Sequence, residues 1–150
     1  HYDHAENDDL FPNAKIIVQR KELESAAAPI VERFYVREDV ADFVDKFWER
    51  MMLVDGDMEI FPDIQLIKSS GHTLGHQVIY VKTGKGTAAI CGDEIPLFKN
   101  LTMDIPTGNY IDEVNVLKIT QRIKKECKFI IPGHDPELIQ KFPTIPKCSR

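Results

Sequence analysis

Apolar positions in the first third of the chain predict a strand, a short helix and a longer amphipathic helix. Residues 14–19 (AKIIVQ) are a β-branched run typical of a strand, and residues 20–28 (RKELESAAA) are good helix formers that stop before Pro29. From Glu38 to Met52 the apolar residues recur at intervals of three and four, which places them on one helical face. We therefore predict one β-α step followed by a docked helix.

The rest of the chain alternates between strand-like and helix-like spacing after a turn at residues 55–57 (DGD). The predicted elements are a strand region at 58–69 interrupted at Pro62-Asp63, a hairpin of 77–82 and 87–91 around a glycine-bearing loop at 83–86, a helix at 111–125 and a strand at 128–131. From Phe142 onward the chain carries two prolines and predicts a poorly ordered tail. This order indicates an α/β chain whose residues 1–150 form a single domain.

Composition describes a globular domain and narrows the class of partner. The 150 residues are 43% hydrophobic and 29% charged, the balance of an ordinary domain. A net charge of −5 with dispersed Lys and Arg argues against a nucleic-acid partner. No apolar run reaches the ~18 residues of a membrane span, and the N-terminus lacks the features of a signal peptide. We therefore expect no membrane association and a cytoplasmic location.

The three cysteines do not predict a metal or disulfide framework. Cys91, Cys127 and Cys148 are too few and too irregularly spaced for either. We expect them to be reduced structural thiols.

Histidines carry the chemical signal of the sequence. All five lie in loops or at strand ends: His1, His4, His72, His76 and His134. A single histidine is more often a surface or core residue than a ligand, so the prediction depends on the set. Residues 1–4 (HYDH) place two imidazoles and a carboxylate in one tight turn, a spacing that suits two metal ions better than one.

Three more loops offer metal ligands at the ends of predicted strands. They contain His72 in GHTLGH, Asp93 after Cys91-Gly92, and His134 after Pro132-Gly133. Loops at strand ends could converge on one rim, and a carboxylate such as Asp93 can bridge two cations. Nitrogen and oxygen donors without thiolates suit catalytic zinc, and also Mn, Fe or Co. Two such ions can share a hydroxide that serves as the nucleophile, so that no Ser or Cys nucleophile is required.

The motif order HxDH, GHTxGH, GD and GH resembles the metallo-β-lactamase superfamily, whose full first motif is HxHxDH. Within it, HYDHAEN, the VQR segment and IIPGHDPE look most like the N-acyl-homoserine lactonase and pyridoxolactonase branch. The resemblance covers nearly the whole chain and implies an αββα sandwich. The first histidine of HxHxDH and the N-terminal strands would lie before His1, so the chain would be about the C-terminal two thirds of that fold. Either the chain is truncated or another polypeptide supplies the rest.

The resemblance implies roles for individual residues. His1 and His72 would bind the first metal, and Asp93 would bridge to the second. The remaining ligands of the second metal would be Asp3, His4 and His134. Asp3 would also pass a proton to the departing alkoxide. His76 matches a histidine that is usually not a ligand, and we expect it to form structural hydrogen bonds.

The predicted function is a metal-dependent hydrolase that cleaves a small lactone or another carboxylic ester through a metal-bound hydroxide. Its cofactors would be two divalent metal ions, zinc first. The alternatives are a thioester hydrolase of the glyoxalase type and a non-catalytic metal-binding module. A phosphodiesterase or nuclease is disfavoured by the acidic balance. A homodimer is left open.

Several residues near the motifs allow two interpretations. Homoserine lactonases of the branch carry a tyrosine three residues after the bridging aspartate, where this chain has Pro96, so the substrate could differ unless Tyr110 supplies the hydroxyl. Glu94 could contact the substrate or a metal. Residues Phe43, Phe47, Trp48 and Met51 could line an acyl pocket, although we favour core packing. Asp135 and Glu137 could orient an imidazole or be solvated loop charges.

Overall fold

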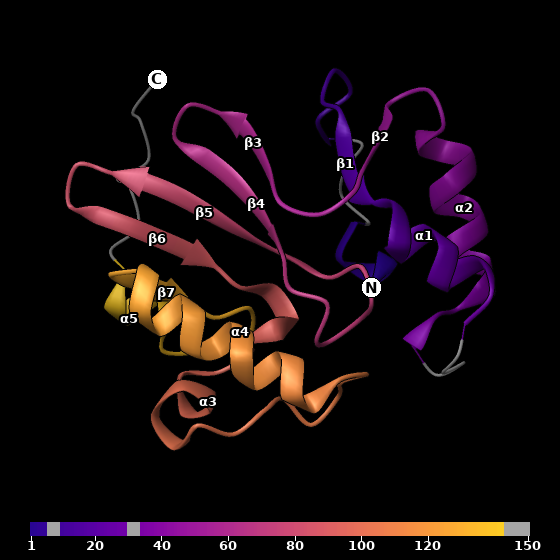
Figure 1. Cartoon of the computed structure of the whole chain (residues 1–150). Helices are drawn as coiled ribbons and strands as arrows, with labels where there is room; N and C mark the ends of the chain where they lie inside the picture. Colours follow the sequence, from indigo (N-terminus) through magenta and orange to yellow (C-terminus); the bar gives the residue numbers. More distant parts are fainter. Residues whose placement is uncertain (6–9, 30–33, 143–150) are drawn as a thin grey trace.

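The computed structural model describes residues 1–5, 10–29 and 34–142, and of Asp3 the backbone alone. The architecture is mixed α/β with two sheets (Figure 1). β1 (Ile16–Gln19) and β2 (Met51–Val54) form a parallel pair. The larger sheet has the order β3-β4-β5-β6-β7, in which only the β6·β7 pairing is parallel. Its strands are β3 (Met58–Phe61), β4 (Ile64–Lys68), β5 (Gln77–Thr83), β6 (Gly86–Ile90) and β7 (Phe129–Ile131).

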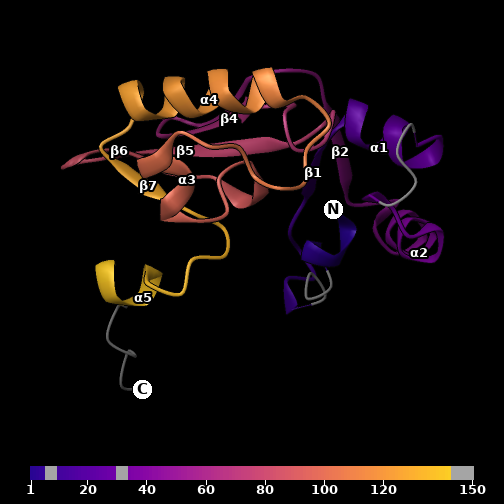
Figure 2. The same ribbon diagram turned by 90° about the horizontal axis from the view of Figure 1, so that it is seen from below.

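Helices lie beside both sheets. α1 (Arg20–Ala27) and α2 (Arg37–Phe47) lie next to β1 and β2. α4 (Glu113–Glu126) runs along one face of the five-stranded sheet (Figure 2). The short helices are η1 (Tyr2–Ala5), η4 (Gly92–Glu94), α3 (Phe98–Met103) and α5 (Leu138–Lys141). No helix in the described ranges is long and apolar enough to cross a membrane.

The sequence of α4 explains where the helix starts and which face it buries. Asp112 caps the N-terminus, because its side chain accepts a hydrogen bond from the Asn115 amide at 2.9 Å. Lys124 and Lys125 lie in the last turn, where a positive charge complements the helix dipole. The apolar positions face the sheet and bury Ile119 and Ile123. The spacing of the apolar residues and the capping residues thus both predict a helix that packs against the sheet with one face.

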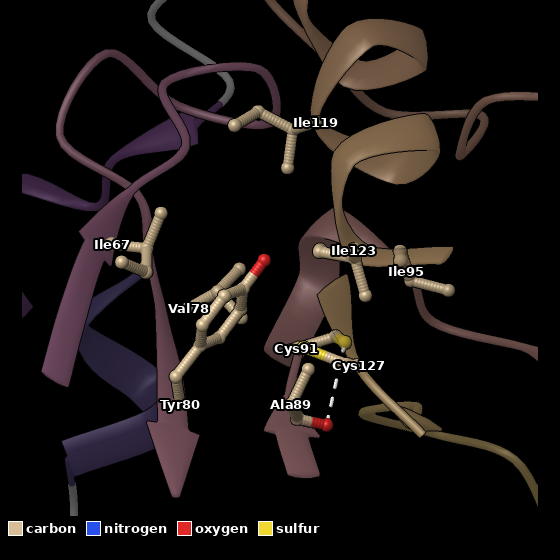
Figure 3. Packing of buried hydrophobic residues seen from close by; sticks show 9 residues of the cluster. All are labelled: Ile67, Val78, Tyr80, Ala89, Cys91, Ile95, Ile119, Ile123 and Cys127. Atoms are coloured by element: carbon tan, nitrogen blue, oxygen red, sulfur yellow. Dashed lines mark hydrogen bonds between the residues drawn. The ribbon is translucent and has the colours of Figure 1, made fainter. Parts of the chain in front are cut away.

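The core lies between α4 and the sheet (Figure 3). Its residues come from β4, β5, β6, α4 and the segments that follow β6 and α4, and they are Ile67, Val78, Tyr80, Ala89, Cys91, Ile95, Ile119, Ile123 and Cys127. Val78, Ala89, Cys91 and Ile123 have no exposed surface. The prediction of structural thiols is confirmed for Cys91 and Cys127, which are buried and free. Cys148 lies outside the described residues.

The opposite face of the five-stranded sheet is also apolar. Side chains alternate between the faces of a strand, so Ile79 points away from the α4 side that receives Val78 and Tyr80. Its register partners in the next two strands are Ile90 and Ile131. Ile90 is 42% exposed and Ile131 is half-buried. This second face is therefore less completely covered than the α4 side.

Most predicted elements are confirmed, with two corrections. The helix predicted for residues 38–52 ends at Phe47, and Met51 begins β2 instead. α3 lies in a stretch for which no element was predicted. The strand region at 58–69 is two antiparallel strands turning at Pro62-Asp63, and the hairpin of β5 and β6 forms around 84–85. Residues 143–150 of the predicted tail lie outside the described residues.

Candidate metal centre

The four motifs meet at the ends of the central strands. His72 lies in the loop between β4 and β5, Asp93 lies in η4 directly after β6, and His134 follows β7. η1 brings His1 and His4 to the same place from the N-terminus, which Figure 1 shows beside the loops that follow β4 and β6. Residues separated by almost the whole chain therefore form one cluster.

Asp93 is the centre of this cluster. Its Oδ2 atom lies 3.3 Å from His72 Nε2, 3.4 Å from His4 Nε2 and 3.9 Å from His1 Nδ1. Its Oδ1 atom lies 2.6 Å from His134 Nε2. One carboxylate thus contacts imidazoles on both sides, which is the geometry that a bridging ligand requires.

The cluster divides into two potential ligand groups that share Asp93. The first group is His1, His72 and Asp93, and the second is His4, Asp93 and His134. Within each group the possible ligand atoms lie within 4.8 Å of one another. In the first group His72 Nε2 is also 3.4 Å from His1 Nδ1.

Two glycines allow the second group to assemble. Gly92 has φ +52°, a left-handed conformation that turns the chain sharply between Cys91 and Asp93. At Gly133 a Cβ atom would lie 2.6 Å from the Gly92 carbonyl oxygen, so no side chain fits there. The two backbones therefore approach closely, and this contact brings Asp93 and His134 together.

A backbone carbonyl orients His72. The Nδ1 atom of His72 lies 2.6 Å from the carbonyl oxygen of Asn109, which can only accept a hydrogen bond. Nδ1 must therefore carry a proton, and in a neutral ring the lone pair is on Nε2, the atom that lies near His1 and Asp93. A ring held in this tautomer, 2% exposed, is prepared to bind a cation.

The side chains around the cluster keep Asp93 ionised. Partial burial alone would raise the pKa of this carboxyl, but the hydrogen bond and charge of His72 and the charges of His4 and His134 hold it well below its usual range. Asp93 is therefore a carboxylate at neutral pH, as a metal ligand must be.

His76 and Glu94 lie beneath the cluster and belong to neither ligand group among the described residues. His76 Nδ1 lies 2.7 Å from Ser69 Oγ and 3.3 Å from Glu94 Oε2, and burial lowers its pKa to about 3. Glu94 Oε2 also accepts the His72 amide at 3.2 Å. Burial raises the pKa of Glu94 despite these bonds. Both residues thus support the His72 loop from below, which agrees with the structural role expected for His76.

Aromatic rings cover the outer side of the first group. Phe34 stacks on His1 with ring centroids 5.4 Å apart, and Tyr35 meets His1 edge-on at 6.2 Å. A cavity of about 350 Å³ beside them is lined by Phe34, Tyr35, Asp39 and Asn109, among others. His1 is therefore held between aromatic rings and His72.

The other candidate residues are Asp3, whose side chain lies outside the described part of the structure, and Asp135 and Glu137, which have partners other than imidazoles. The side chain of Asp3 is outside the described residues, although its backbone lies in η1 between His1 and His4. The carboxylate of Asp135 accepts the amides of Phe98 and Glu137, not an imidazole proton. Glu137 pairs with Lys141 at 3.0 Å.

The aromatic stripe of α2 is divided between core and surface. Phe43 and Phe47 are buried, as core packing predicts. Trp48 is 70% exposed, so the prediction of core packing is wrong for this residue. Met51 is half-buried in β2.

Sequence reasoning missed two residues that hold the cluster together. Asn109 acts through its backbone carbonyl, for which the side chain gives no signal. Glu22 accepts hydrogen bonds from the His72 loop. The sequence gives one indication of this role. Glu22 lies on the same helical face as Ser25 and Ala26, whose small side chains allow another segment to pack closely against that face.

The donor set fits divalent cations. Atoms able to bind a cation converge in both groups, and Nε2 of a neutral His72 would offer its lone pair near His1 Nδ1 and Asp93. Such convergence is unfavourable without a positive charge between the atoms. Nitrogen and carboxylate donors without sulfur suit zinc or a similar catalytic metal.

Comparison with known proteins supports the resemblance seen in the motifs. No protein-family profile matches the chain. The chain is 29% identical to the N-acyl homoserine lactonase of Bacillus thuringiensis over 141 residues, which cover 91% of this chain and 53% of that protein. It therefore spans about half the length of the curated relatives that it matches.

Solved structures give the same result for the fold. An N-acyl homoserine lactone hydrolase with the product N-hexanoyl-L-homoserine at its catalytic metal centre matches with a TM-score of 0.73 and 27% identity, over 93% of this chain and 54% of that one. A candidate metallo-β-lactamase from Thermotoga maritima matches with a TM-score of 0.66 and 21% identity, over 90% and 63% of the two chains, and supports the fold alone. The chain is thus similar in sequence to N-acyl homoserine lactonases, and its fold matches about half to two thirds of these metallo-β-lactamase-fold structures.

Proposed function

We propose that this chain carries the metal centre of a hydrolase that cleaves a lactone or another carboxylic ester. The observation that carries the proposal is Asp93, whose two oxygen atoms lie within 3.9 Å of four imidazoles. The homologous lactonases support the reaction class. The chain spans about half the length of those relatives, so we propose its hydrolytic activity from the metal centre and from the similarity together.

The proposed cofactors are two divalent metal ions, with zinc first and Mn, Fe or Co as alternatives. His1, His72 and Asp93 would hold one ion, while His4, Asp93 and His134 would hold the other. We assign Asp3 to the second ion as a further ligand. When bound, a pair of such ions supplies Lewis acidity that polarises an ester carbonyl and lowers the pKa of water.

Residues of the chain supply orientation and proton transfer. The Asn109 carbonyl fixes the tautomer of His72, and Glu94 holds the backbone of the same residue. Asp93, whose pKa lies below its usual range, contributes a negative charge between the two groups at neutral pH. We assign the proton transfer to Asp3: its carboxylate would accept the proton released when water adds to the ester carbonyl and would donate it to the departing alkoxide oxygen.

The proposed substrate is a small cyclic ester. N-acyl homoserine lactones are the substrates named by the relatives. Pro96 stands where the resemblance implies a substrate-binding tyrosine, and the Tyr110 hydroxyl donates to Glu113 at 3.2 Å. We therefore favour a lactone whose recognition does not depend on that hydroxyl.

Metal removal tests the proposal directly. We expect a chelator to abolish hydrolysis of a lactone and Zn²⁺, Mn²⁺ or Co²⁺ to restore it, with metal content measured in the same samples. The same preparations should be assayed on a thioester and on a bis-aryl phosphodiester. Full lactone hydrolysis after verified metal removal would contradict the mechanism.

The substrate panel also separates the alternatives. A preference for the thioester would favour a hydrolase of the glyoxalase type. Two bound ions without turnover of any substrate would favour a metal-binding module.

A further inference from the structure

Glu22 is a buried carboxylate to which the proposed chemistry gives no role. It lies on α1 and is 8% exposed, on the helical face that also buries Ser25 and Ala26. Removing a carboxylate from water is costly unless it accepts hydrogen bonds. The partners of Glu22 are therefore informative about why a charge is placed there.

Glu22 binds the loop that carries His72. Its Oε2 atom accepts hydrogen bonds from Thr73 Oγ1 at 2.6 Å and from the Gly75 amide at 2.9 Å. Thr73 directly follows His72 in the chain and has no exposed surface. Hydrogen bonds to an ionised carboxylate are shorter and stronger than neutral ones. They fix the backbone immediately after the ligand.

Glu22 also binds the aromatic segment that covers His1. Its Oε1 atom accepts a hydrogen bond from the Tyr35 hydroxyl at 2.9 Å. The Tyr35 ring contacts His1 edge-on, so the position of this ring limits the position of the imidazole. Burial and the negative charge of Glu22 both raise the pKa of Tyr35, which keeps the phenol protonated as a donor.

The backbone of the loop packs directly against α1 at this point. A Cβ atom on Gly75 would lie 2.2 Å from the backbone nitrogen of Glu22 and 2.3 Å from its Cβ atom. No larger residue fits without moving the loop. Both the side-chain hydrogen bonds of Glu22 and this close backbone approach thus limit the position of the loop.

These contacts concern the first ligand group and not the second. Among the described residues, the side-chain hydrogen bonds of Glu22 reach Thr73, Gly75 and Tyr35 alone. His134 is placed instead by its own backbone, whose amide donates to the Pro96 carbonyl at 2.9 Å. His72 and His134 therefore depend on different supports.

We propose that Glu22 is a positioning residue for the two imidazoles that belong to the first ligand group alone, His1 and His72, and that it does not position His134 of the second group. The carboxylate ties α1 to the loop behind His72 and to the ring beside His1. This inference rests on the proposed function, because it assumes that both groups bind metal.

Stepwise metal binding in the full protein tests the inference. Co²⁺ would be titrated into the metal-free protein and followed by its absorption spectrum, with His72→Ala and His134→Ala assigning one binding step to each group. Glu22→Gln should weaken the first-group step by about tenfold and leave the second unchanged, since residues that orient metal ligands typically contribute about 10- to 100-fold to affinity. Glu24→Gln is the matched control, because this carboxylate is exposed and pairs with Lys21 at 3.3 Å. It should change neither step.

A second variant distinguishes positioning from general loss of stability. Thr73→Val removes the hydroxyl donor and leaves the carboxylate in place, so it should weaken the same step as Glu22→Gln. The double variant should lose less than the product of the two single losses, because both remove one hydrogen bond. Circular dichroism and urea unfolding would establish that each variant is folded.

Each outcome decides the inference. Loss confined to the first step supports it, whereas equal weakening of both steps or no weakening overturns it. If the unmodified protein bound no metal, the proposed function and this inference would both fail. If the unmodified protein bound two ions and Glu22→Gln bound them equally well, only the inference would fail.

Discussion

Asp93 is the side chain that links the two candidate ligand groups. It is the only residue common to the two ligand groups within the described part of the chain. Its two oxygen atoms have different neighbours: Oδ1 lies near His134, and Oδ2 lies near His1, His4 and His72. Loss of this carboxylate should therefore affect both ions, unlike loss of any single imidazole.

The first prediction compares Asp93 with His76. Asp93→Ala should reduce affinity for both ions by more than about 100-fold, because it removes a ligand and not merely a residue that orients one. His76→Ala should lower metal content less than Asp93→Ala, since His76 bonds to Ser69 and Glu94 and belongs to neither ligand group among the described residues. Metal content after equilibrium dialysis measures both effects. Equal losses in the two variants would contradict the proposed ligand set.

The sequence predicts the candidate ligands better than it predicts the residues that support them. His72, Asp93 and His134 each stand beside glycine at a strand end, a local pattern that can be recognised without the fold. The support from Asn109 depends on a backbone carbonyl 37 positions away, and that from Glu22 on a loop 51 positions away. Such long-range partners exist only once the chain has folded.

Helices and strands, too, can be predicted where the determining residues lie within the segment, and are mispredicted where contacts with distant segments decide the structure. The β5·β6 hairpin and α4 are predictable because turn residues, caps and apolar spacing lie within the segments themselves. Met51 continues the helical spacing of α2, yet it pairs with Ile16 of β1 in a parallel sheet. Arg50 supports this change, because it donates to the carbonyls of Phe11 and Ala14 near β1. Tertiary pairing therefore overrides local periodicity there.

The second prediction concerns the docking of α4. Ile123→Ala should lower the free energy of unfolding by about 2–5 kcal/mol, because it leaves a cavity among tightly packed residues. Ile123 has no exposed surface, whereas Ile139 in α5 is 72% exposed. Ile139→Ala is thus a control with the same chemical change and should shift stability by less than about 0.5 kcal/mol. Urea unfolding measures both, and similar shifts would show that α4 does not carry the core.

The whole molecule places the candidate centre where its two sheets meet. Gln19 at the end of β1 bonds to Gln77 at the start of β5 at 3.2 Å, and Gln77 donates to the Ile17 carbonyl at 3.1 Å. The ligands come from the N-terminus and the five-stranded sheet, while Glu22 and Tyr35 come from the α1 side. Ligand binding and the contact between the two parts of the fold should therefore be coupled.

The third prediction follows from that coupling. Zn²⁺ at a free concentration of 100 times its dissociation constant should raise the free energy of unfolding by about 2.7 kcal/mol for each ion that binds only the folded state. Thermal or urea unfolding with and without Zn²⁺ measures the difference. Asp93→Ala should abolish most of this stabilisation. A metal effect of equal size in that variant would show that Zn²⁺ acts elsewhere on the protein.

The last prediction concerns substrate choice. If an active-site tyrosine contacts the carbonyl oxygen in homoserine lactonases, its replacement by Pro96 removes a donor of the kind that is typically worth ~2.7–4 kcal/mol in the transition state. N-acyl homoserine lactones should therefore react with a kcat/KM roughly 10²-fold below that of the best lactone.

Pro96→Tyr tests this reasoning with Pro96→Phe as its matched control, because only the former restores a hydroxyl. The proline contributes its carbonyl to His134, and a backbone carbonyl survives either substitution. We expect the tyrosine variant alone to gain activity on homoserine lactones. Tyr110→Phe should have little effect, since that hydroxyl already donates to Glu113. Efficient hydrolysis of homoserine lactones by the unmodified protein, unchanged in Tyr110→Phe, would show that the missing tyrosine does not limit this substrate.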